Sequence, residues 1–196
     1  MASLMLHLVV AEQYYKYNEL TEKMEFLKGN LAPDLCEYKE AGHFVEDKPY
    51  KTYVESIKER VDLKKFCSKV SLDSDFNKGY FFHLVVDYVF YKLYLPTLKA
   101  YTLLDEMEYD KAISLVYDEY GRMGYIIAKN FGVKNISILP TFAQVQDNDK
   151  LQLFDECGVV HVIKQCSKLD IEESYEKVKE GVFDRYIKEK IGEIQK

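Results

Sequence analysis

Residues 79–96, GYFFHLVVDYVFYKLYLP, are apolar or aromatic at almost every position. A helix that is hydrophobic around its whole circumference belongs in the interior of a protein, so this stretch predicts a buried central helix. His83 and Asp87 interrupt it, and their i, i+4 spacing places both side chains on one helix face. A buried imidazole or carboxylate needs a hydrogen bond, an ion pair or a metal ion. Taken alone, the pair fits a hydrogen bond inside the core.

The rest of the chain predicts further helices and little β structure. A helix capped by Ser3 is followed by one that Gly29 should end, and Pro33 suits the start of another. An amphipathic helix is expected within residues 50–70, one or two helices before Gly132, and a helical tail from residue 170.

Two stretches of the second half are candidates for a short β segment, namely VKNISILPTF at 133–142 and GVVHVIKQC at 158–166. The second of these is also compatible with a buried helical turn. We therefore expect a mostly α, single-domain helical bundle over residues 1–196. Ligand-bearing helices are expected in residues 1–100, and the helical half at 101–196 has no assigned role.

Composition and charge limit the classes of function. A hydrophobic content of 47% and a charged content of 31% are those of a globular protein. The formal net charge of −6 argues against a basic surface for nucleic acids. The N-terminal segment lacks the basic region and cleavage site of a signal peptide, and no apolar run is long enough to span a bilayer. The expected location is the cytoplasm, with the four cysteines reduced and buried.

Three further side chains make the His83–Asp87 pair a candidate metal site. His7 lies in the apolar run LMLHLVV, Asp34 follows the turn GNLAP, and His43 lies in AGHF. Together these residues offer three imidazoles and two carboxylates. Such a set suits Zn²⁺, with Mn²⁺ or Fe²⁺ also open, and it is large enough for one or two ions.

Four motifs occur in a defined order: HLVVAEQ, FLKGNLAPDL, GHF and GYFFHLVVDYVFY. In this order they resemble the zinc-dependent phospholipase C family, which is related to the P1-type nucleases. The resemblance covers about the first half of the chain and does not extend into residues 97–196. It implies the helical bundle of that family, and hydrolysis of a phosphoester bond by a zinc-bound hydroxide that attacks phosphorus.

The resemblance also implies roles for the individual residues. The ligands of the family's first zinc ion are matched by Asp34, His43, His83 and Asp87. Asp34 would also orient the attacking water as a catalytic residue. His7, with Asp87 as a bridge, matches part of a second site, which in the family is completed by the N-terminal residue of the mature protein. The family's third site needs histidines beyond this helix, where the chain has YVFYKLYL, so we expect one or two zinc ions.

The sequence leaves the substrate and two alternative functions open. A phospholipid and a small phosphoester both fit as the substrate. The main alternative is a non-catalytic or degenerate metal-binding protein of the same fold. An HD-type phosphohydrolase is also helical and rich in His and Asp, but it requires an adjacent His-Asp pair, and none of the four histidines precedes an Asp. The aromatic helices leave room for a homodimer interface.

Other polar residues are expected to lie outside the site. We interpret His161, within VVHVI, as a core residue with one hydrogen bond, and Glu12 as part of a solvated helix face. Asp118, Glu119 and Arg122 are interpreted as a cluster of surface charges.

Overall fold

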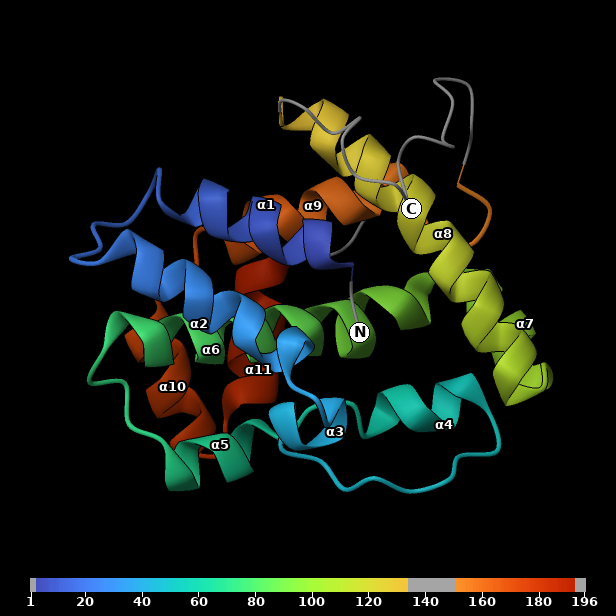
Figure 1. Ribbon diagram of the computed structural model, residues 1–196, viewed down its shortest axis with the longest axis horizontal. Helices are drawn as coiled ribbons and strands as arrows, with labels where there is room; N and C mark the ends of the chain where they lie inside the picture. Colours follow the sequence, from blue (N-terminus) through green and yellow to red (C-terminus); the bar gives the residue numbers. More distant parts are fainter. Residues whose placement is uncertain (1–2, 134–150, 193–196) are drawn as a thin grey trace.

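The aromatic stretch forms α6 (Asp75–Tyr88), which runs through the middle of the molecule (Figure 1). The structure is a computed structural model that describes residues 3–133 and 151–192. Ser74 caps α6 by accepting a hydrogen bond from the backbone N–H of Asn77. Beyond Tyr88 the chain stays helical as far as Thr97, but its winding changes. It widens into a π-helical segment, η1 (Val89–Tyr94), and then tightens into a 3₁₀ turn, η2 (Leu95–Thr97).

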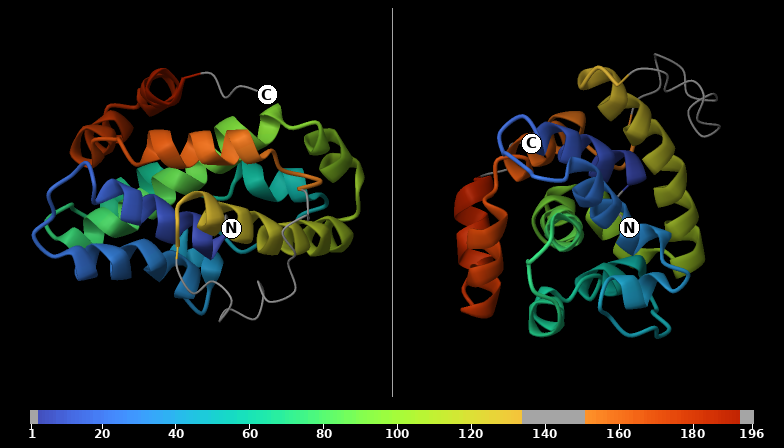
Figure 2. Two further views of the ribbon diagram at one scale, coloured as in Figure 1. Left: turned by 90° about the horizontal axis from the view of Figure 1, so that it is seen from above. Right: turned by 60° about the vertical axis from the view of Figure 1, so that its left-hand side comes forward.

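The remaining helices surround α6, and the right-hand view of Figure 2 looks nearly along its axis. They are α1 (Leu4–Tyr14), α2 (Lys23–Leu35), α3 (Lys39–Gly42), α4 (Tyr53–Lys58), α5 (Leu63–Lys69), α7 (Ala100–Glu106), α8 (Tyr109–Asn130), α9 (Glu156–Cys166), α10 (Ile171–Lys179) and α11 (Phe183–Ile191). No strand occurs within the described ranges, so the mostly α fold is confirmed. One hydrophobic core includes residues from both halves of the chain.

The two candidate β segments have different outcomes. Residues 158–166 are wholly helical and belong to α9, whose buried Val159, Val162 and Ile163 recur at helical spacing, so a strand there is wrong. Asp155 caps this helix by accepting from the N–H of Gly158. The other stretch, from residue 134 onward, lies outside the described residues.

The crossing of α2 and α6 is unusually close, and it corrects the expected end of a helix at Gly29. A Cβ atom on Gly29 would lie 1.9 Å from the carbonyl oxygen of Phe76, and one on Gly79 would lie 1.9 Å from that of Phe26. Both positions therefore exclude a side chain. α2 continues through Gly29 and has Pro33 in its last turn, so the expected new helix start at Pro33 is also wrong.

The single helix expected within residues 50–70 is instead two short helices, α4 and α5. Thr52 caps α4, and Asp62 caps α5 by accepting from the N–H of Lys65. Asp62 also donates its own backbone N–H to the carbonyl of His43, which ties the start of α5 to the end of α3. The turn between α4 and α5 carries Arg60.

The C-terminal half packs α8 and α9 against α1, and it shows that Glu119 is not a surface charge. Its side chain is 1% exposed and accepts the backbone N–H groups of Gln152 and Leu153, so the carboxylate fixes the segment before α9. Arg122 pairs with it at 3.3 Å, while Asp118 is exposed as expected. Within the described ranges, no helix is both long and apolar enough to cross a membrane.

The four cysteines are unpaired, but their expected burial holds only in part. Cys166 is buried, whereas Cys157 at the start of α9 is exposed. Cys36 and Cys67 lie between these extremes.

Candidate metal centre

All five predicted ligand residues converge at one place in the fold. His7 comes from α1, Asp34 from the last turn of α2, His43 directly follows α3, and His83 and Asp87 come from α6. Their side chains are between 0% and 6% exposed. Two overlapping groups could hold a metal ion: His7 with His83 and Asp87, and Asp34 with His43 and His83.

Four ligand atoms form a compact set: Asp34 Oδ1, His43 Nε2, His83 Nε2 and Asp87 Oδ2. Asp87 Oδ2 lies 3.1 Å from His43 Nε2 and 3.7 Å from His83 Nε2. The two imidazole nitrogens lie 3.2 Å apart. Asp34 Oδ1 lies 3.6 Å and 3.7 Å from them. A tetrahedral ion with bonds of about 2.0–2.1 Å separates its ligands by about 3.3–3.4 Å, so each of these pairs is spaced like two ligands of one tetrahedral ion.

Backbone carbonyls fix the tautomers of two histidines. The Nδ1 atom of His43 lies 2.7 Å from the carbonyl oxygen of Lys39, and that of His83 lies 2.7 Å from the carbonyl oxygen of Asn30. A carbonyl oxygen only accepts, so both Nδ1 atoms carry a proton, and the Nε2 atom of each neutral ring presents a lone pair. This is the outer support that metal-bound imidazoles normally have.

Four acceptor atoms so close together repel one another unless a proton or a cation lies between them. Asp34 Oδ1 is buried and has no hydrogen-bond partner among the described residues. A buried acceptor without a donor is costly, and a divalent cation would satisfy all four atoms at once.

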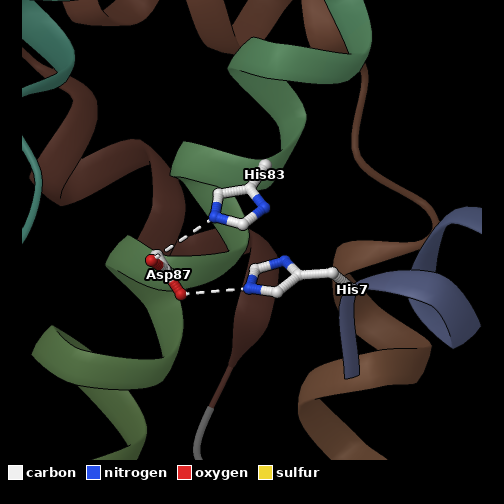
Figure 3. A group of neighbouring side chains, drawn as sticks. All are labelled: His7, His83 and Asp87. Atoms are coloured by element: carbon white, nitrogen blue, oxygen red, sulfur yellow. Dashed lines mark ion pairs between the residues drawn. The ribbon is translucent and has the colours of Figure 1, made fainter. Parts of the chain in front are cut away.

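The second oxygen of Asp87 faces His7, as Figure 3 shows. His7 Nε2 lies 3.2 Å from Asp87 Oδ1, and the His7 ring stacks on the His83 ring with centroids 3.7 Å apart. Neither ring nitrogen of His7 has a hydrogen-bond partner among the described residues. One carboxylate oxygen of Asp87 therefore faces the Nε2 atoms of His43 and His83, and the other faces that of His7.

The electrostatics keep His83 and Asp87 in the protonation states that metal binding requires. Burial, reinforced by the neighbouring His7, holds the pKa of His83 well below its usual value, so the ring is neutral near neutral pH. Burial alone would raise the pKa of Asp87, but the neighbouring imidazoles of His43, His7 and His83 outweigh it and hold that pKa well below the usual range.

The backbone around His43 is shaped to bring the ring inward. A Cβ atom on Gly42 would lie 2.7 Å from the carbonyl oxygen of Pro33, so this glycine lets α3 approach the end of α2. The Tyr80 hydroxyl donates to the Gly42 carbonyl at 2.6 Å. Phe44 has a φ of +63°, which few residues other than glycine adopt, and the chain turns sharply there after His43.

His161 and Glu12 lie outside the site, as expected. His161 is half-buried, and its Nε2 atom lies 2.8 Å from the carbonyl oxygen of Ile191, which confirms the expected hydrogen bond. Glu12 is exposed on α1.

No protein-family model matches the chain, and neither a characterised protein nor a solved structure matches it significantly. The fold and the site therefore define a mostly α protein with a buried His/Asp cluster that could hold a metal ion.

Three supporting groups had no signal in the sequence. The carbonyls of Lys39 and Asn30 belong to the backbone, so no residue type indicates them. Arg60, a half-buried cation near Asp87, lies in a charge-dense stretch that resembles a solvated helix.

The free energy of unfolding of the metal-free protein is expected to fall as the pH is lowered from about pH 7 to about pH 5. The pKa of His83 is lowered in the folded state and near 6.5 in the unfolded state, so the unfolded chain takes up a proton first. One such proton gives a slope of at most about 1.4 kcal/mol per pH unit. Urea unfolding at a series of pH values measures it. A stability independent of pH over this range would contradict the buried, neutral state of His83.

Proposed function

We propose that the protein is a metal-dependent hydrolase of phosphoester bonds and that its metal is zinc. The observation that carries the proposal is the spacing of 3.1 to 3.7 Å among four inward ligand atoms, with the second Asp87 oxygen turned towards His7. Nitrogen and carboxylate ligands at tetrahedral spacing favour Zn²⁺ over Mn²⁺ and Fe²⁺, which more often take six ligands. The order of the four sequence motifs supports the same class of enzyme.

Bound zinc would supply two effects: it lowers the pKa of a coordinated water to about 7, and it polarises a phosphoryl oxygen. The protein's own residues would do the rest. His43 and His83 hold their Nε2 lone pairs in place through the carbonyls of Lys39 and Asn30. Asp87 would bridge two ions, one at each oxygen. Asp34 would be a ligand through its inward oxygen, which has no donor among the described residues, and would also orient the attacking water.

The degree of burial favours a second candidate function. The ligand side chains are at most 6% exposed, and a hollow beside them, lined by His43 and Arg60 among others, measures about 10 Å³. That is room for about one water molecule. Closed sites with four protein ligands are typical of structural zinc. A non-catalytic helical protein stabilised by zinc would have this form.

Metal content and turnover, measured together on His83→Ala, test both candidates. Zinc-loaded wild type is expected to hydrolyse p-nitrophenyl phosphate, and the variant is expected to lose both zinc and turnover by about a hundredfold or more. Elemental analysis gives the zinc per chain, and circular dichroism shows whether the variant is folded.

His161→Ala is the matched control, because it also removes an imidazole with one backbone hydrogen bond, although a half-buried one, and lies outside the site. It should keep zinc and activity. Wild type that holds zinc and hydrolyses no phosphoester would favour the structural function. Equal zinc in wild type and His83→Ala would contradict both candidates.

A further inference from the structure

We propose that Arg60 binds the phosphoryl group of the substrate, and that the substrate is a small phosphate ester whose remaining part occupies the cleft outside Arg60. This inference rests on the proposed function for its reaction, but the binding of an oxyanion at Arg60 can be tested without turnover.

Arg60 is a half-buried cation that forms no ion pair with a carboxylate of the described residues. Its Nε atom is buried and has no hydrogen-bond partner in the described part of the chain. The guanidinium carbon lies 5.9 Å from the centre of the Tyr91 ring. Burial opposes the charge, but attraction from Tyr91 and Asp87 more than offsets it and raises the pKa of Arg60. The guanidinium is therefore charged and has N–H donors to offer.

The position of Arg60 connects the metal centre with the surface. It lines the small hollow beside His43, together with Glu40 and Val45. The same three residues, Glu40, Val45 and Arg60, also line a cleft of about 290 Å³ that extends past Tyr50 and Tyr109. An ester that enters this cleft reaches Arg60 before it reaches the ligands. Since the hollow holds about one water, the phosphoryl group must displace the Arg60 side chain slightly to approach the metal.

Of the residues that the structure describes, three carboxylates (Glu40, Asp47 and Glu59) and two cations line the cleft, and of the cations Arg60 is the one free to bind an anion. Lys48 also lines the cleft, but its ammonium group pairs with Glu59 at 2.5 Å. Among the described residues of the cleft, the cation with no carboxylate partner is Arg60. A guanidinium presents several N–H donors in a planar fork that matches two oxygens of a phosphate group.

The size of the cleft limits the substrate. Pockets for drug-sized ligands measure about 300–1,000 Å³, so a cleft of about 290 Å³ lies at the small end of that range. Two acyl chains of a phospholipid exceed this space. A phosphate ester with a single small organic group fits, with room for that group in the part of the cleft lined by Tyr50 and Tyr109.

The test uses zinc-loaded full-length protein and inorganic phosphate as the probe. Isothermal titration calorimetry gives the Kd of phosphate for wild type and for Arg60→Met, which keeps the length of the side chain and removes its charge. The variant is expected to keep the wild-type zinc content and to bind phosphate at least about tenfold more weakly. Arg60→Gln gives the same comparison if Arg60→Met does not fold.

Lys48→Met is the matched control, since it removes a cation from the same cleft whose charge is already paired with Glu59. It should change the Kd of phosphate by less than about twofold. Unchanged phosphate binding by Arg60→Met at full zinc content would overturn the inference, and so would equal weakening by both variants.

Substrate comparison tests the size of the ester. Wild type should hydrolyse p-nitrophenyl phosphate faster than dispersed dioctanoyl phosphatidylcholine, and the reverse order would overturn the assignment to small esters. If wild type hydrolyses neither compound but binds phosphate through Arg60, the anion site stands and the proposed hydrolase function fails.

Discussion

Asp87→Asn is expected to lower the zinc affinity of the protein by about a hundredfold or more, because metal ligands matter more than their outer supports, whose loss costs about 10–100-fold. Asp87 Oδ2 lies 3.1 Å from His43 Nε2, and Asp87 Oδ1 lies 3.2 Å from His7 Nε2. Asparagine keeps the shape of the side chain but loses the charge and one of the two acceptor oxygens. The change should therefore weaken both metal positions together. Competition with a chelating dye measures the affinity.

The same substitution should also reduce the stabilisation that zinc provides. A ligand at about 100 times its Kd stabilises the native state by about 2.7 kcal/mol, and a hundredfold weaker site loses most of this. Thermal unfolding with and without zinc measures the difference. Asp184→Asn is a matched control, since this exposed carboxylate accepts from the Tyr88 hydroxyl and is not a ligand. If Asp87→Asn held zinc as tightly as wild type, Asp87 would not be a ligand.

The sequence predicted those features that depend on local spacing and burial. An all-round apolar helix must be buried, and the i, i+4 spacing alone puts His83 and Asp87 on one face. The apolar setting of His7 likewise predicted its burial. These arguments, with the order of the motifs, were enough to name all five residues that converge in the structure.

The sequence could not show features that depend on contacts between distant segments. Glycine is common at helix ends, so the sequence predicted an end at Gly29. In the structure glycine is needed there because the Phe76 carbonyl of α6 occupies the space of a Cβ atom. Glu119 looks like a surface charge within DEYGR, yet it accepts N–H groups from a segment more than 30 residues away. Arg60 falls in a turn between two helices where periodicity predicted one.

Gly79→Ala is expected to lower the free energy of unfolding by about 2–3 kcal/mol, although alanine is the better helix former by about 1 kcal/mol. The new Cβ atom would lie 1.9 Å from the Phe26 carbonyl oxygen and 2.9 Å from the Asn30 backbone nitrogen. Backbone atoms cannot rotate away as side chains do, so α2 and α6 must separate. Urea unfolding measures the loss of stability.

The separation should also reach the metal centre, because the Asn30 carbonyl that fixes His83 lies on α2. Zinc affinity should fall by about tenfold, the usual effect of losing such a support. Gly181→Ala is the control: φ is +75° and no atom lies near the new Cβ, so backbone strain should cost about 1 kcal/mol without changing zinc affinity.

Gly29→Ala should act like Gly79→Ala, since its Cβ atom would meet the Phe76 carbonyl across the same crossing. Once either alanine has separated the two helices, the second has less overlap to relieve. The double variant should therefore lose less stability than the two single losses added together. Fully additive losses, or a stabilised Gly79→Ala, would mean that the helices are not held together at these glycines, and would remove the reason for glycine in two of the four motifs.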